Sequence, residues 1–124
     1  MPAGNFEIKI KKMRTKKMSD TYLRIHTVEF QFGKGVRGGQ QYPAVTLYIN
    51  NKKRERIVGS GFSLMTAVLY DFLISNFPKL MTSTNRVKSQ GNFKYGLHLL
   101  EKITKSKLTM IEHNNKRLLF ANVS

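Results

Sequence analysis

The residues of this chain best suited to chemistry are tyrosines and basic side chains that share the same short segments. Tyr22, Tyr42 and Tyr48 offer aromatic faces, and a lysine or an arginine lies a few positions from each of them. An aromatic ring can stack on any nucleic-acid base, and a neighbouring cation can pair with the phosphates of the backbone. This combination predicts binding of nucleic acid, DNA or RNA, with a single strand favoured over a duplex.

The candidate binding residues are these tyrosines together with the basic residues near them and near the N-terminus. The full set is Lys9, Lys11, Lys12, Arg14, Tyr22, Arg24, Lys34, Arg37, Tyr42, Tyr48, Lys52, Lys53, Arg54 and Arg56. Positions 9–17 hold six basic residues and no acid. That run indicates either a track for phosphates or a solvated edge strand whose lysines discourage aggregation. The charge of the whole chain favours the phosphate track.

The charge of the chain points to a polyanionic partner. Its 124 residues include 22 Lys and Arg against 7 Asp and Glu, which gives a formal charge of +15. Such self-repulsion costs stability unless an anionic partner uses it. The hydrophobic content of 40% excludes a disordered basic tail and predicts one domain over residues 1–124.

Enzymatic chemistry is disfavoured, and no cofactor is implied. The chain has no cysteine, its histidines (His26, His98 and His113) are dispersed, and its acids show no clustered pair. Residues 33–38 match the G-x-G-x-x-G pattern, but Tyr42 and Pro43 introduce a strand where a dinucleotide site needs a helix. The glycine-rich segment 33–41 is therefore interpreted as a loop, either a plain connector or a cationic finger that follows phosphates.

The sequence also predicts where the protein works. No apolar segment at the N-terminus resembles a secretion signal. The longest apolar run, Ala67–Ile74, contains Asp71 and is too short to cross a bilayer. We expect an intracellular protein, in the cytoplasm or with the chromosome, that is not secreted and has no membrane partner.

Alternation of apolar and polar residues predicts several strands before the first helix. They are residues 6–13, Tyr22–Phe32, Tyr42–Ile49 and Arg54–Val58, with a turn at residues 50–53. The alternation of Tyr22–Phe32 changes phase, so either a bulge near His26 and Thr27 keeps Phe30 and Phe32 in the core, or both rings belong to an exposed aromatic platform. Tyr42–Ile49 is clearer, because its tyrosines lie opposite its aliphatic residues.

The rest of the chain predicts helices and a hairpin. Ser63 is a suitable N-cap for an apolar helix, Leu64–Asn76, which Pro78 ends. A loop over residues 79–93, a short helix over 96–105 and a hairpin of 107–113 with 116–123 should follow. The predicted fold class is α+β: a twisted antiparallel sheet of four or more strands with a long helix packed on one face, plus a C-terminal short helix and β-hairpin.

Two segments resemble a known family. Residues 6–14, Phe-Glu-Ile-Lys-Ile-Lys-Lys-Met-Arg, are similar to the opening strand of the single-stranded-DNA-binding coactivator positive cofactor four and its Whirly relatives. Residues 59–64, Gly-Ser-Gly-Phe-Ser-Leu, resemble the small-residue entry into that family's long helix. The resemblance covers residues 6–77, and the chain departs from it in the longer glycine segment and in the C-terminal hairpin. It implies a homodimer or higher oligomer with bases splayed over the sheets.

Two other classes of function are compatible with the same residues. One is a basic structural component of a ribosomal or viral nucleoprotein particle, in which the cations hold RNA or DNA permanently. The other is a protein-binding module or inhibitor whose basic face docks on an acidic protein. Salt-dependent binding to oligonucleotides would distinguish the two nucleic-acid-binding hypotheses from a module that docks on an acidic protein.

Overall fold

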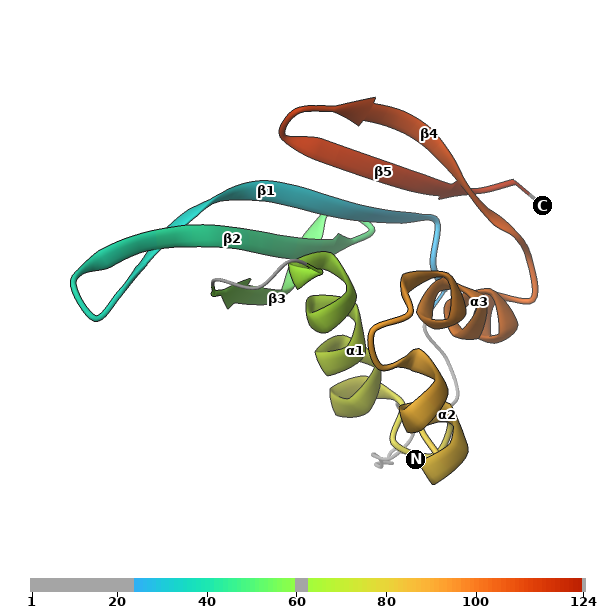
Figure 1. The fold of residues 1–124 in the computed structure, drawn as a ribbon. Helices are drawn as coiled ribbons and strands as arrows, with labels where there is room; N and C mark the ends of the chain where they lie inside the picture. Colours follow the sequence, from blue (N-terminus) through green and yellow to red (C-terminus); the bar gives the residue numbers. More distant parts are fainter. Residues whose placement is uncertain (1–23, 60–62, 124) are drawn as a thin grey trace, which may run out of the picture.

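The computed structural model describes residues 24–59 and 63–123, which form an α+β fold of five strands and three helices (Figure 1). The strands are β1 (Thr27–Arg37), β2 (Gln40–Ile49), β3 (Lys52–Val58), β4 (Leu108–Asn114) and β5 (Arg117–Asn122), and the helices are α1 (Leu64–Asn76), α2 (Ser83–Ser89) and α3 (Phe93–Thr104). The strands form one antiparallel sheet in the order β3-β2-β1-β5-β4. The predicted α+β class with an antiparallel sheet of four or more strands is confirmed.

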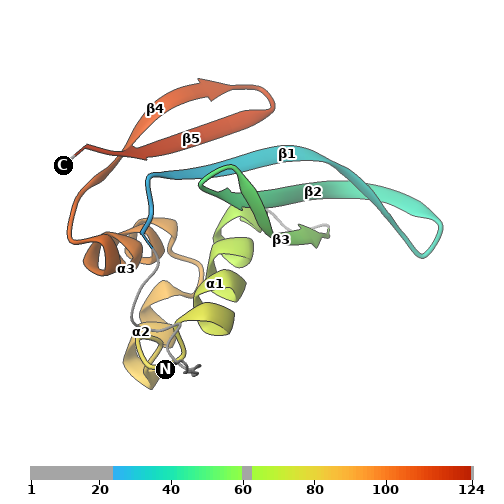
Figure 2. The same ribbon diagram turned by 180° about the vertical axis from the view of Figure 1, so that it is seen from behind.

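All three helices lie on the same side of the sheet, and the hydrophobic core lies between the two layers (Figures 1 and 2). The register pairs Val28 with Ile49 and Phe30 with Leu47, so alternate residues of β1 and β2 point toward the helices. Phe30 is fully buried and meets the rings of Phe93 and Phe120 edge-on, at centroid distances of 5.3 and 6.4 Å. Phe30 is therefore a core residue, which removes it from any aromatic platform.

The phase change before Phe30 has a different cause from the predicted bulge. β1 begins only at Thr27, and Ile25 is buried in the segment that precedes the strand. The side chain of Asn50 holds this segment: its Oδ1 accepts from the backbone N–H of His26 and of Thr27, and its Nδ2 donates to the carbonyl of Arg24. β1 has no bulge there, because the strand starts later and Ile25 reaches the core from outside it. The consequence expected of the bulge is confirmed, since Phe30 is in the core and Phe32 packs against it.

The glycine-rich segment is not a loop, contrary to the prediction. β1 runs to Arg37 and β2 starts at Gln40, so only Gly38 and Gly39 form the turn, at φ values of +58° and +83°. Positive φ at both central residues is what the tight turn of a β-hairpin needs. Beyond the pair Gly33–Ala44, the ribbon of residues 34–43 is paired with no further described strand and projects from the sheet (Figure 1). We call residues 34–43 the arm.

α1 has the predicted bounds but lacks the predicted cap. Ser63 has a φ of +77° and makes no side-chain hydrogen bond to the helix. α1 packs against β2, β3 and α3, with Val68, Leu69 and Phe72 buried. The sheet face is thus shared among the helices, so the prediction of a long helix across it is only partly matched.

The C-terminal half differs from the sequence prediction in two places. Residues 83–89 form α2 where a loop was expected, and α3 begins at Phe93, before the predicted start at residue 96. The hairpin of β4 and β5 turns at Asn115 and Lys116, one residue later than predicted. β5 pairs with β1, so the hairpin extends the main sheet and is not a separate appendage. The strand predicted over residues 6–13 lies outside the described residues.

Candidate nucleic-acid interface

The sheet surface turned away from the helices, here called the outer face, carries several of the predicted binding residues. Across the strands, Tyr48 lies between Glu29 and Lys53, and Thr46 lies between Gln31 and Arg56. Tyr42 shares this face farther along β2, opposite Gly35. The predicted placement of Tyr42 and Tyr48 opposite the aliphatic residues of β2 is confirmed. Both tyrosines are half-buried.

Arg54 does not join these residues, although period-2 alternation along Arg54–Val58 would place this predicted binding residue on the same face as Arg56. A bulge in β3 leaves Arg54 without a partner between Glu55, which faces Leu47, and Lys53, which faces Tyr48. The Arg54 guanidinium turns toward the helices, 5.2 Å from the centre of the Phe72 ring, and its Nη2 donates to Asn76 Oδ1 at 2.9 Å. The placement of Arg54 next to the tyrosines is therefore wrong, because the irregularity of β3 reverses its side.

Arg56 connects β3 to the base of the arm, and Arg37 connects the outer end of the arm to β3. Arg56 Nη1 donates to Thr46 Oγ1 at 2.8 Å, and its Nη2 donates to the carbonyl of Lys34 at 3.2 Å. Arg37 Nη1 donates to the carbonyl of Val58 at 3.2 Å. A guanidinium has further N–H donors, so each of these arginines can brace the sheet and still offer charge to a phosphate.

The arm is a basic ribbon without an acidic residue. Lys34 and Arg37 are exposed, and Val36 at its end has 70% of its surface exposed. The Tyr42 hydroxyl donates to Gln40 Oε1 at 2.9 Å, and this hydrogen bond fixes the outer end of the tyrosine side chain. The glycine segment thus supplies a projecting cationic element, built from two strands and not from a flexible finger.

The remaining predicted residues are spread over other parts of the chain. Lys52 is exposed beside Lys53 at the start of β3. Arg24 is exposed and lines a polar pocket of about 500 Å³ with His26 and Lys105, which places it with α3 and not with the tyrosines. Five further candidates lie outside the described residues: Lys9, Lys11, Lys12, Arg14 and Tyr22.

The other half of the outer face is close to neutral. Arg117 on β5 pairs with Glu112 on β4 and lies 3.6 Å from the carboxylate of Glu29 on β1. The hydrogen bond and the charge of Glu112, with a smaller contribution from Glu29, raise the pKa of Arg117 above its ordinary value. Glu29 is buried and also accepts from Gln31 Nε2 at 3.0 Å. Arg117 pairs with both acids of this region, Glu29 and Glu112. The cationic part of the outer face is therefore limited to β2, β3 and the arm.

Sequence reasoning missed a cleft between β1 and the turn of the β4–β5 hairpin. It has a volume of about 630 Å³ and is lined by Gln31, Phe32, Asn114, Asn115, Lys116 and Arg117. Phe32 is half-buried, and its backbone N–H donates to the carbonyl of Lys116. Amide side chains beside an aromatic ring are suited to the edge and the face of a base. The amides and cations of residues 114–117 were the available signal, but only the fold shows that they meet Phe32.

The cations of α2 and α3 were not among the predicted binding residues, because these segments were expected to form a loop and a short helix. Lys88, Lys94 and Lys102 are exposed on these helices. Their signal was the helical spacing of Lys94, His98 and Lys102, which becomes meaningful once α3 is known to begin at Phe93.

Comparisons with protein-family models, with curated proteins and with solved structures give no match for this chain. Among residues 24–59 and 63–123, no helix is long and apolar enough to cross a membrane. The same residues contain no group of three or more histidine or acidic side chains arranged to hold a metal ion.

Proposed function

We propose that this protein binds nucleic acid without catalysing a reaction, and that it holds a single strand on the cationic half of its outer face. The surface consists of Tyr42, Tyr48, Lys53 and Arg56 together with the arm. The observation that carries the proposal is that Lys53 and Arg56 lie on the same sheet face as the two tyrosine rings. The nearest acid, Glu29, is already engaged by Arg117 and Gln31.

The overall charge supports a polyanionic ligand. The described residues contain 16 of the 22 basic residues and 5 of the 7 acidic residues, which leaves an excess of 11 positive charges. Even if every described acid paired with one cation, most cations would lack an acidic partner. Neutralising several phosphates releases condensed counterions, and this release supplies most of the affinity for a nucleic acid.

The geometry gives each group a role in holding the strand. The tyrosine rings would stack on bases, which contributes about 1–3 kcal/mol per base. Lys53 lies beside Tyr48 and would pair with the adjoining phosphate, while Lys34 and Arg37 would follow the backbone along the arm. Lys52 extends the same cationic edge. Because no acidic side chain occurs in the arm, the backbone meets no repulsion there.

Two further features belong to this proposal. The resemblance to positive cofactor four and the Whirly proteins would make the protein a homodimer or higher oligomer, with bases splayed over the sheets of its subunits. A protein of this kind would act inside the cell, in the cytoplasm or with the chromosome. Sedimentation equilibrium of the full chain tests the first feature, and fractionation of its source cells tests the second.

The proposal is tested by fluorescence anisotropy with labelled single-stranded DNA, single-stranded RNA and duplex DNA. Affinity for the single strands should be highest and should fall steeply between about 50 and 200 mM salt. Replacing Tyr42 and Tyr48 together by Ala should weaken single-strand binding about tenfold or more, given the stacking contribution per base. The double replacement by Phe keeps both rings and should retain most of the affinity.

Two outcomes would contradict the proposal. Absence of binding to every oligonucleotide at low salt would remove nucleic acid as the ligand and favour a basic module that docks on an acidic protein. Equal losses for single strands and duplex in the Tyr42→Ala, Tyr48→Ala variant would show that the rings do not stack on bases. Circular dichroism of each variant checks that the fold is retained.

A further inference from the structure

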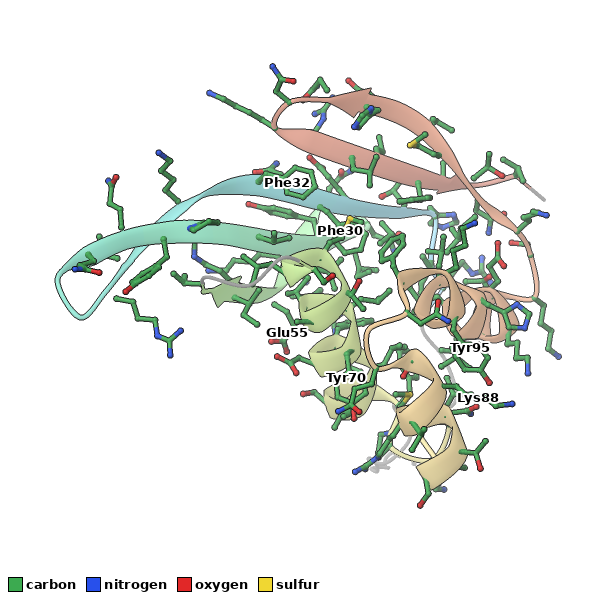
Figure 3. The ribbon with its side chains drawn as sticks, in the orientation of Figure 1. Phe30, Phe32, Glu55, Tyr70, Lys88 and Tyr95 are labelled. Atoms are coloured by element: carbon green, nitrogen blue, oxygen red, sulfur yellow. The ribbon has the colours of Figure 1, made fainter. Side chains whose placement is uncertain are left out.

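α2 and α3 form a compact helix–turn–helix on the side of the molecule opposite the outer face. Residues 90–92 connect the helices, and Gly91 has a φ of +70°, which glycine adopts without strain. The two helices are fixed to each other, because the Tyr95 hydroxyl donates to Asn85 Oδ1 at 2.8 Å and Lys88 Nζ lies 5.9 Å from the centre of the Tyr95 ring (Figure 3). The unit is therefore held in one arrangement.

Both helices have side-chain caps, and α3 is docked firmly on the rest of the protein. Thr82 accepts from Asn85 N–H at the start of α2, and Asn92 accepts from Tyr95 N–H at the start of α3. A Cβ at Gly96 would lie 2.9 Å from Leu69 Cδ2, so the glycine allows α3 to approach α1 closely. Phe93 packs against Phe30 and Phe120. One side of α3 is thus committed to the core.

The opposite side of α3 is a cationic stripe. Lys94, His98 and Lys102 follow one another at four-residue spacing and are exposed. Neither lysine side chain has a hydrogen bond or an ion pair with another described residue. The one acid of α3, Glu101, faces His98 and not the lysines: its Oε1 lies 3.8 Å from His98 Nδ1, and its Oε2 accepts from Leu108 N–H at 2.8 Å.

Helix stability explains only part of this stripe, because Lys102 lies in the last turn of α3, where the helix dipole favours a cation. Lys94 lies in the first turn of α3, where unsatisfied N–H groups and the helix dipole favour an acid and disfavour a cation. A solvated helix face is normally stabilised by acids placed three or four residues from the lysines. No acid lies three or four residues from Lys94 or Lys102 along α3. Glu101 lies three residues from His98, and its Oε2 holds the start of β4. The position of Lys94 thus disfavours the free helix and is suited to an anionic ligand.

We infer that α3, presented by the helix–turn–helix, binds duplex DNA in its major groove. An α-helix with its side chains is about 10–12 Å across and fits the B-form major groove, which is about 12 Å wide. Lys94 and Lys102 are about 12 Å apart along the helix axis and would reach phosphates on either side of the groove, with His98 between them toward the base edges. The major groove of duplex RNA is too narrow for a helix, so DNA is the specified ligand.

This surface and its ligand are separate from those of the proposed function. The helices cover one side of the sheet, and the outer face is the other side (Figures 1 and 2). A duplex on α3 would not compete with a single strand on Tyr42 and Tyr48. The structure therefore allows one chain to hold a duplex and a single strand together.

The test compares two double variants of the full chain that remove the same charge. Lys94→Ala with Lys102→Ala changes the stripe, and Lys52→Ala with Lys53→Ala changes the start of β3 as the matched control. Anisotropy is measured with one sequence prepared as duplex DNA, duplex RNA and single-stranded DNA. The stripe variant should lose about tenfold in affinity for duplex DNA, and its salt slope should fall by about 2, as expected for two lost phosphate contacts.

The stripe variant should keep single-strand affinity within twofold, whereas the control variant should keep duplex affinity within twofold. Equal losses on duplex DNA for both variants would show general electrostatic attraction and overturn the inference. So would absence of duplex binding by the unmodified protein, or equal affinity of the stripe for duplex RNA. Because the readouts use different strands and different variants, failure here is distinguishable from failure of the proposed single-strand site.

Discussion

The cations of the sheet and the cations of α3 differ in whether their side chains make structural contacts. Arg37, Arg54 and Arg56 each donate to an oxygen elsewhere in the sheet or on α1, so their guanidinium groups are partly structural. Lys94 and Lys102 touch no described hydrogen-bond or ion-pair partner. A planar guanidinium suits bracing, whereas a lysine on a flexible stem is a point charge in solvent. A count of cations therefore overstates how many charges of the sheet are free of structural contacts, and the lysines of α3 have no such contacts.

The largest expected effect tests whether the two regions are one cooperative unit. Phe30 is fully buried and joins β1 to Phe93 of α3 and Phe120 of β5. Phe30→Ala should lower the free energy of unfolding by about 3–5 kcal/mol, because it removes transfer energy and leaves a cavity. Denaturant titration followed by circular dichroism should show one transition at a lower midpoint.

Phe32→Ala, on the same face of β1 but half-buried, is the control and should cost clearly less. Two separate transitions in the Phe30 variant would contradict the prediction. They would show that the sheet and the helices unfold independently, so that the two cationic regions belong to different folding units.

The second effect separates a structural arginine from a binding lysine one position away. Arg54→Ala removes the contact with Phe72 and the hydrogen bond to Asn76, and should lower the free energy of unfolding by about 1–2 kcal/mol. Single-strand affinity should barely change, because Arg54 faces the helices. Lys53→Ala should do the reverse, with little loss of stability and weaker binding to the single strand. Denaturant midpoints and anisotropy measured on the same preparations distinguish the two roles. An affinity loss confined to Arg54→Ala would refute the structural role of Arg54 and the binding role of Lys53.

A comparison of β2 with β3 shows where side-chain positions could be predicted from the sequence. Period-2 alternation placed Tyr42, Val45, Leu47, Tyr48 and Ile49 on their correct faces, because β2 is regular along its length. The same rule failed for Arg54, since a bulge reverses the sides of a strand and leaves no mark in composition. The site was therefore predicted only where the strands are regular.

The missed elements have a different physical reason. α2 buries only Ser89, so it carries no apolar stripe from which a helix is recognised. Its real signal is local: Thr82 caps the start, and Gly91 follows the end. Likewise Gly33 and Gly35 read as loop residues, although they occupy one face of β1. Tertiary packing overrides their low strand propensity.

The third effect concerns that packing at the base of the arm. A Cβ at Gly35 would lie 2.7 Å from Val58 Cγ2 and 3.2 Å from Arg56 Nη2, whereas nothing lies within 4 Å of a Cβ at Gly33. Gly35→Ala should therefore lower the free energy of unfolding by about 1 kcal/mol, the low end for overpacking, because the Val58 side chain can partly yield. The added methyl group should also displace Arg56 from its hydrogen bond to the Lys34 carbonyl, and so weaken single-strand binding.

Gly33→Ala is the matched control and should leave thermal stability unchanged or slightly raised, since it reduces the freedom of the unfolded chain. Duplex affinity, which depends on α3, should be unchanged in both glycine variants. A stability loss of equal size in Gly33→Ala would show that the close approach of Val58 is not the cause.

The smallest expected effect on stability is the sharpest test of the helix surface. Lys94 lies in the first turn of α3 and Lys102 in the last turn. Lys94→Glu places an acid at the positive end of the helix dipole and should raise the free energy of unfolding by about 0.3–1 kcal/mol, whereas Lys102→Glu should lower it by a similar amount. Both variants change the charge equally, and both should weaken binding to duplex DNA. Denaturant midpoints at low salt and anisotropy with duplex DNA measure the two quantities.

Opposite changes in stability with parallel losses of affinity cannot arise from damage to the fold, so they would assign the losses to contacts made by α3 itself. Unchanged duplex affinity in Lys94→Glu would instead leave the stripe as a solvated face and the sheet as the protein's cationic surface.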